Sequence, residues 1–177
     1  MLLPFLALAV PFLAPGEQAP ANLANASFER GLDGWRVAGH RGFRTAVADS
    51  PSRPGAARGR RWLTSGWAAR SAAPPGAETR ITTLVDARPW RGRRLRLTAM
   101  TRVPEFADRA VQLRVRTTGP SGMRTTATNL LASPNWRRHV VDFVVPFEAG
   151  LIEIGFILPG TAAQLEADDL RIEDLRR

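Results

Sequence analysis

The chain has 177 residues, a formal net charge of +9 and no cysteine. The absence of cysteine excludes a disulfide framework, a thiolate nucleophile and a cysteine-linked lipid anchor. Every basic residue is arginine, and the missing lysine, together with abundant Ala, Pro and Gly, indicates a compositional bias rather than selection for guanidinium chemistry. The positive charge still attracts polyanions, which could be nucleic acid, anionic lipid headgroups or an acidic polysaccharide. Of these three partners, nucleic acid is the least expected.

The N-terminal segment has the pattern of a secretory signal peptide. Residues 1–14 are apolar, but the stretch is too short and too interrupted by proline to span a bilayer. Ala19-Pro20-Ala21 supplies a small-residue cleavage site, which predicts a signal peptide over residues 1–21. An uncleaved apolar tail is the alternative. The remaining residues, 22–177, have the length of a single domain, and we expect a secreted or periplasmic bacterial protein without a membrane span.

Alternation of apolar and polar residues with a period of two dominates the chain after residue 78. It is clearest in residues 94–103 and recurs in residues 111–116, 141–145 and 152–158. No segment shows a sustained helical period. The pattern predicts an all-β fold, an antiparallel β-sandwich of roughly eight to ten strands.

Two tryptophans, Trp62 and Trp67, lie between segments rich in Pro, Gly and Arg at residues 48–61 and 70–77. Long loops in a compact sandwich are often functional, and a Trp ring exposed beside a groove stacks on the apolar face of a pyranose. We therefore expect both tryptophans to contact a ligand. Trp67 is the stronger candidate, because its Ser, Gly and Ala neighbours leave the ring uncovered. Packing at the edge of the core is the alternative.

Arginines alternate with apolar residues on two consecutive strands of the pattern. Arg94 and Arg96 on one strand, and Arg114 and Arg116 on the next, are predicted to line the outward side of neighbouring strands. Like charges that lie opposite each other destabilise a sheet, so this ladder needs acidic partners or an anionic ligand. Arginine binds a carboxylate bidentately. A solvated face produced by the compositional bias is the alternative.

The sequence carries no recognisable catalytic motif. His40 and His139 belong to no nucleophile motif, and no G-x-S-x-G, H-E-x-x-H, P-loop or dinucleotide-binding pattern occurs. A triad assembled from distant residues would leave no such pattern. We expect a protein that is not an enzyme.

The two ends of the predicted domain carry its most distinctive motifs. Residues 22–29, Asn-Leu-Ala-Asn-Ala-Ser-Phe-Glu, precede Gly34-Trp35, and residues 165–173 read Leu-Glu-Ala-Asp-Asp-Leu-Arg-Ile-Glu. With residues 86–99 and 134–136, these motifs resemble those of galactose-binding-like β-sandwiches, which are jelly rolls, and especially carbohydrate-binding modules of the family four, nine and twenty-two type. The resemblance implies a non-catalytic domain that binds carbohydrate. It also implies that three tryptophans pack in the fold: Trp35, Trp90 and Trp136.

The same resemblance implies a structural calcium ion where the first and last strands meet. Its ligands would come from Glu29, Asp168 and Asp169. Calcium takes about six to eight oxygen ligands, mostly from carboxylates and backbone carbonyls. Strand parity places Asp168 on the inward face with Leu170 and Ile172, which makes it the expected first ligand. A salt bridge to arginine is the alternative for these carboxylates.

The leading hypothesis is a secreted, non-catalytic module that binds an acidic polysaccharide or cell-envelope glycan by Trp stacking and Arg–carboxylate pairing. The alternative is a structural module that docks on an envelope protein and has no sugar site. A groove that holds Trp62 or Trp67 favours sugar, whereas a flat apolar patch favours a protein partner. Polyanion binding by charge alone would show a steep dependence on salt without preference among sugars.

Overall fold

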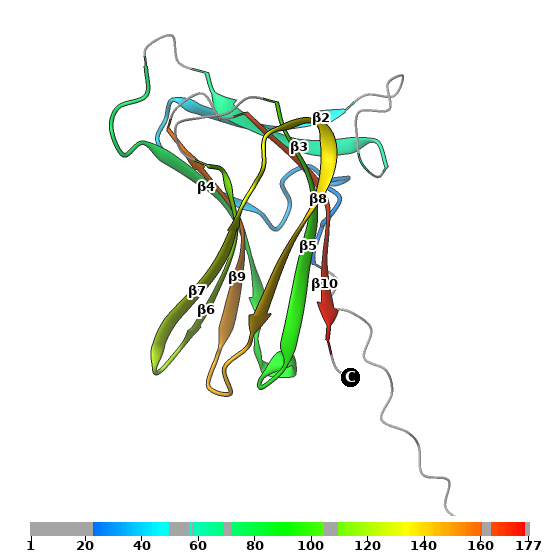
Figure 1. Cartoon of the computed structure of the whole chain (residues 1–177), viewed down its shortest axis with the longest axis vertical. Helices are drawn as coiled ribbons and strands as arrows, with labels where there is room; N and C mark the ends of the chain where they lie inside the picture. The colour runs from blue at the N-terminus through cyan, green and yellow to red at the C-terminus, as the bar shows by residue number, and fades with distance from the viewer. Residues whose placement is uncertain are drawn as a thin grey trace, which may run out of the picture.

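The structure, a computed structural model, describes residues 23–49, 57, 59–68, 72–104, 110–160 and 164–175. These residues form ten β-strands and one short 3-10 helix (Figure 1). The strands are β1 Arg36–Gly39, β2 Phe43–Asp49, β3 Arg61–Trp67, β4 Glu78–Asp86, β5 Arg94–Val103, β6 Gln112–Gly119, β7 Gly122–Asn129, β8 Ser133–Val144, β9 Leu151–Pro159 and β10 Leu165–Asp174. The 3-10 helix, η1, is Arg88–Trp90. The predicted signal peptide, residues 1–21, lies outside the described residues.

The strands form two five-stranded antiparallel sheets, with the orders β1-β4-β9-β6-β7 and β2-β3-β10-β5-β8. We name them the β9 sheet and the β10 sheet after their central strands. In Figure 1, β4, β6, β7 and β9 lie on one side of the sandwich, and β5, β8 and β10 lie on the other. This architecture confirms the predicted all-β antiparallel sandwich. Within the part of the chain described, no helix has the length and apolar character needed to cross a membrane.

The core lies between the two sheets and follows the period-two pattern of the sequence. On β5, Leu95 and Leu97 are fully buried, whereas Arg94 is exposed. On β9, Ile154 and Phe156 are equally buried. Successive residues of a strand point to opposite faces of the sheet. The apolar side chains of each strand therefore face the other sheet, where they are buried away from water.

Strands β5 and β6 follow each other in the chain but belong to opposite sheets. The prediction that Arg94 and Arg96 lie on a strand next to that of Arg114 and Arg116 is therefore wrong. Alternation shows which residues of a strand face the core, but it carries no information on which sheet the strand joins. The two pairs of arginines lie on opposite outer surfaces of the sandwich.

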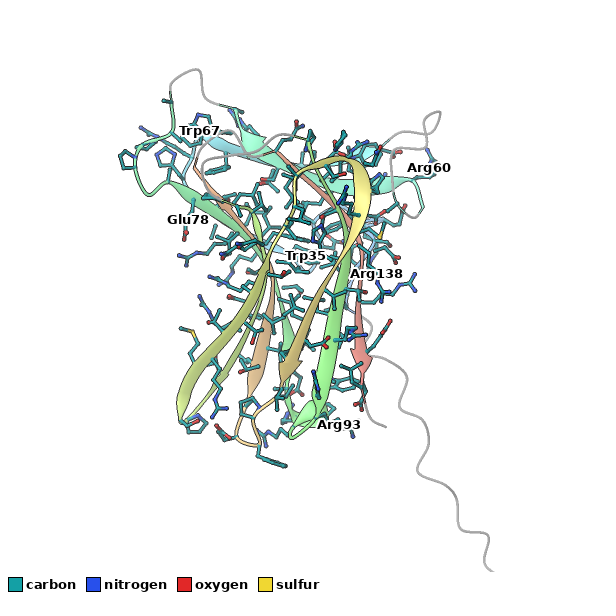
Figure 2. The ribbon with its side chains drawn as sticks, viewed as in Figure 1. Trp35, Arg60, Trp67, Glu78, Arg93 and Arg138 are labelled. Carbon is teal, nitrogen blue, oxygen red and sulfur yellow. The ribbon has the colours of Figure 1, made fainter. Side chains whose placement is uncertain are left out.

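Residues 23–35 form a series of turns that contact β10 and β4, although the motif they carry was expected to form a strand. Asn25 organises these turns: its Oδ1 accepts the Arg30 amide at 2.9 Å, and its Nδ2 donates to the Gly31 carbonyl at 2.8 Å. Local side-chain bonds of this kind compete with sheet formation. Phe28 and Trp35 extend from the turns into the core, their ring centroids 5.0 Å apart, and Trp35 lies between the sheets (Figure 2).

Strand β10 contains a bulge that reverses the expected direction of one side chain. Its pairing with β5 shifts register between Asp168 and Arg171, and Asp169 adopts a left-handed backbone with a φ of 49°. Asp168 is opposite Met100 and lies on the outward side, whereas Leu170 points into the core. The prediction that Asp168 shares the inward face of Leu170 is therefore wrong, because the extra bulge residue breaks the parity. Asp168 is nevertheless fully buried.

Candidate functional site

Trp62 and Trp67 both lie on β3, but they face opposite sides of it. Trp67 shares the inward side with Leu63 and Ser65 and packs against the core, whereas Trp62 points outward from the β10 sheet. Trp62 is only 9% exposed, and its indole N–H has no acceptor among the described residues. The two rings therefore do not line a common groove.

Neighbouring residues cover the Trp67 ring. The His40 ring lies 5.2 Å away between centroids, and Phe43 meets Trp67 edge-on at 5.3 Å. Gly42 lies so close that a Cβ at this position would overlap the indole. The expectation that small neighbours in sequence leave this ring uncovered is wrong, because the covering groups come from β2 and the turn before it. Both tryptophans fit the packing alternative.

Arg94 and Arg96 lie on the outer surface of the β10 sheet, where they share one carboxylate. Arg96 binds Asp142 of β8 with two hydrogen bonds of 2.7 and 2.9 Å, while Arg94 lies 3.7 Å from it. The Arg96 guanidinium holds the pKa of Asp142 below its ordinary value. The neighbouring strand β8 thus provides the acidic partner of Arg96. Arg94 is largely exposed and contributes little to the binding of Asp142.

Arg114 and Arg116 lie on the outer surface of the β9 sheet and are less well matched. A single oxygen, Glu153 Oε1 of β9, lies 3.5 Å from a terminal nitrogen of each. The two arginine side chains are only 15% and 24% exposed. The Arg114 nitrogen near Glu153 is Nη2, and it makes no hydrogen bond; the Nε–H of Arg116 has no acceptor among the described residues. Both nitrogens are buried. Burial and the adjacent charge of Arg116 lower the pKa of Arg114.

The outward residues around this pair form a polar surface that we name the arginine face. Strand register places Arg36, Thr82, Gly155 and Arg114 in one row across β1, β4, β9 and β6. Gly155 has no side chain, and a Cβ at this position would overlap the Ile81 carbonyl of β4. The arginine face consists of Arg36, Glu78, Arg80, Thr82, Gln112, Arg114, Arg116, Asn129, Glu153 and Gly155.

The charges of the arginine face do not balance. Arg80 pairs with Glu78 on its own strand, through a 2.6 Å bond from its Nε. Glu153 is then shared by two guanidiniums, and Arg36 adds a fourth positive charge. The face therefore carries four arginines against two carboxylates. Alternation in the sequence puts Arg80 and Glu153 on outward sides, but only strand pairing brings them together with Arg114, so sequence reasoning missed the face as a unit.

The carboxylates expected to hold calcium have protein partners. Glu29 Oε1 accepts the backbone amides of Arg60 and Arg61 at 2.8 and 3.1 Å, and the Arg61 guanidinium donates to the Glu29 carbonyl at 2.8 Å. Asp169 accepts two hydrogen bonds from Arg171, at 3.1 and 2.9 Å.

The fit of these groups to a calcium site is poor. Asp168, the third expected ligand, accepts the Asp169 amide at 2.7 Å. Glu29 is exposed while Asp168 is fully buried, and the described residues bring together no group of three Asp, Glu or His side chains that could hold a metal. The contacts of Glu29 and Asp169 favour the arginine alternative. Calcium itself stays a prediction, because these contacts do not test for the ion.

Among the described residues, neither histidine is hydrogen-bonded to a carboxylate or a hydroxyl. His40 Nδ1 accepts the Gly42 amide at 3.0 Å. His139 points inward from β8, opposite Ala99, and its Nε2 has no partner in the described part of the chain. Burial, followed by the charge of Arg137, lowers the pKa of His139.

Comparison with known proteins defines the class of fold. No family model matches the sequence, and no curated protein matches it. The enzymatically active domain of tailspike protein 4 of bacteriophage CBA120 superposes with a TM-score of 0.65 at 12% identity over 86% of this chain, which covers 21% of that structure. The family 61 carbohydrate-binding module TmCBM61, solved with β-1,4-galactotriose, superposes with a TM-score of 0.60 at 16% identity, over 86% of this chain and 97% of the module.

The C-terminal family 22 carbohydrate-binding module of Clostridium thermocellum Xyn10B gives a TM-score of 0.58 at 15% identity, over 84% of this chain and 90% of that chain. At these identities the likeness establishes the fold alone. The chain thus spans a fifth of the tailspike structure but nearly the whole of two binding modules. Its fold is the β-sandwich of carbohydrate-binding modules, as the terminal motifs predicted.

Proposed function

We propose that this protein is a non-catalytic carbohydrate-binding module that binds an acidic polysaccharide on the arginine face. The observation that carries the proposal is that Arg114 and Arg116 share one carboxylate oxygen, 3.5 Å from each, which makes no hydrogen bond with the nearby Nη2 of Arg114, while the Nε–H of Arg116 has no acceptor among the described residues. Unpaired buried donors are costly, most of all on charged groups. The carboxylate of a uronic acid would supply acceptors in the planar geometry that guanidinium favours.

Neutral groups on the same face suit the hydroxyls of a sugar chain. Gln112 and Asn129, joined by a 3.2 Å hydrogen bond, retain further donor and acceptor capacity beside Arg114. Within the described residues the arginine face has no aromatic member. Binding would therefore rest on charge and hydrogen bonds, and not on the stacking first expected of Trp62 and Trp67.

Secretion is part of the proposal and rests on residues 1–21, which have the pattern of a signal peptide. A polysaccharide or cell-envelope glycan would then be met outside the cytoplasm. We expect N-terminal sequencing of the exported protein to begin at residue 22. Recovery of the intact chain from the cytoplasm would contradict this part of the proposal.

Docking on an envelope protein is the second candidate, and a specific patch favours it. Leu84, Met123 and Leu151 are 58%, 57% and 48% exposed on the outer surface of the β9 sheet. Strand register places Met123 and Leu151 in one row, on either side of Thr118. Clustered exposed apolar side chains are typical of protein-binding surfaces.

The proposal is tested by replacing both arginines, as Arg114→Gln with Arg116→Gln. Each charge-assisted hydrogen bond is worth roughly 1.5–3 kcal/mol, so we expect affinity for a polyuronate to fall at least about tenfold. The control is Arg44→Gln with Arg94→Gln, which removes the same charge from the outer surface of the β10 sheet. Equal losses in the two variants would indicate binding by charge alone, and no loss in the first would place the site elsewhere.

A further inference from the structure

The outer surface of the β10 sheet contains a pocket on the side opposite to the arginine face. Its volume is about 360 Å³, at the lower end of the range typical of small-molecule sites. Strands β5, β8 and β10 form its walls. The pocket is lined chiefly by Thr98, Met100, Arg138, Asp169, Arg171 and Glu173.

The bulge in β10 shapes this pocket. Asp169 is the extra residue of the bulge, and its left-handed φ of 49° is unusual for a residue other than glycine. Bulges redirect side chains and are frequent next to binding sites. Two hydrogen bonds from Arg171 fix the Asp169 carboxylate, and the Leu170 amide anchors the bulge to the Ala26 carbonyl at 3.2 Å. These contacts fix the Asp169–Arg171 wall before any ligand binds.

The charges of the pocket balance, unlike those of the arginine face. Two guanidiniums, from Arg138 and Arg171, lie with two carboxylates, from Asp169 and Glu173. Arg96, opposite Glu173 in the ladder, is already bound to Asp142. The site therefore has no surplus charge to attract an ion of either sign.

Charged groups of both signs around a hollow suit a neutral molecule with many hydroxyls. Guanidiniums donate to hydroxyl oxygens, and carboxylates accept hydroxyl protons. Met100 adds an apolar and adaptable surface. Arg138 is exposed, makes no hydrogen bond or ion pair with any described residue, and extends outward from the sandwich (Figure 2). We propose that this pocket is a second binding site, which takes one unit of a neutral sugar independently of the arginine face.

The test is titration of the full chain with a panel of neutral sugars, including galactose, glucose, xylose and β-1,4-galactotriose, followed by calorimetry or NMR. Loss of the Arg138 guanidinium in Arg138→Ala should weaken binding about tenfold or more, as expected for a hydrogen bond to a charged group. Glu173→Gln should also weaken it. The control Arg137→Ala, the adjacent arginine of β8 that does not line the pocket, should bind as the unaltered protein does.

Two further arms separate this inference from the proposed function. Neutral-sugar binding should persist in the Arg114→Gln, Arg116→Gln variant and should change little with salt, because no counterions are released from a neutral ligand. Binding that disappears in that variant, or that survives both Arg138→Ala and Glu173→Gln, would overturn the second site. Absence of saturable binding to every sugar of the panel would also overturn it, whatever the result with polyuronates.

Discussion

At the scale of single residues, the informative groups are polar atoms buried without partners. Most buried polar atoms in proteins are hydrogen-bonded, so each buried polar atom without a partner needs an explanation. Those of Arg114 and Arg116 belong to side chains on the outer surface of the β9 sheet that are 15% and 24% exposed. That of His139 faces the core, and its consequence is for stability.

We expect His139 to make stability fall in mild acid. Burial lowers the pKa of the folded histidine below its ordinary value of 6.5, so the unfolded chain takes up the proton first as the pH falls. The unfolded state then binds more protons, and the free energy of unfolding decreases below about pH 6.5. Above that pH the imidazole is neutral in both states and contributes no pH dependence.

Melting temperatures between about pH 7.5 and pH 5.5 measure this effect, which His139→Phe should largely remove. The carboxylates of Asp142 and Glu148 do not interfere, because their folded pKa values are lowered below 3.8 and 4.5, and their contributions are lost only in stronger acid. Thr101→Val, another buried polar position, is the control and should keep the decrease. An unchanged pH dependence in His139→Phe would show that another group titrates.

At the scale of elements, the sequence predicted each strand better than the partners of that strand. The burial of Leu95 and Leu97 and the exposure of Arg94 follow from local alternation alone. The placement of β5 and β6 in opposite sheets depends on contacts between distant segments, which a period does not encode. The bulge at Asp169 likewise depends on pairing with β5 and on the Ala26 carbonyl, and it reversed the direction expected for Asp168.

In the candidate site, too, the direction of a side chain could be predicted from the sequence, but its contacts with other strands could not. Outward positions for Arg114 and Arg116 could be predicted, but their shared dependence on Glu153 required the order β9-β6 within one sheet. Exposure of Trp67 was misjudged from its sequence neighbours, since Phe43 and His40 cover it across the strand pair. The residues next to Trp67 in the sequence do not show which residues of the neighbouring strand pack against its ring.

The meeting of the N-terminal turns with β10 is where the family resemblance implies calcium. A ligand that binds only the folded state raises stability by mass action. If calcium binds there, the melting temperature should be higher in excess calcium than in chelator; an unchanged melting temperature would favour the contacts of Glu29 and Asp169 with backbone amides and arginine. A rise in calcium that Asp168→Ala abolishes would establish the ion, and Arg61 would then be expected to move.

At the scale of the whole molecule, the sandwich presents two outer surfaces of different chemistry. The arginine face of the β9 sheet carries surplus positive charge, whereas the pocket of the β10 sheet is balanced. Binding at the first should weaken as salt rises, because counterions screen exposed charge, and binding at the second should not. The overall charge of +9 therefore describes neither surface by itself.

The central claim is that the arginine face binds an acidic polysaccharide, and NMR titration with an oligouronate tests it most directly. We expect the side-chain Nε–H signals of Arg114 and Arg116, together with the amides of Thr82 and Gly155, to shift in a saturable way. Signals from the outer surface of the β10 sheet, such as those of Arg94 and Arg96, should stay in place. Shifts confined to the β10 sheet, or absent from the Arg114 and Arg116 side chains at saturation, would contradict the account.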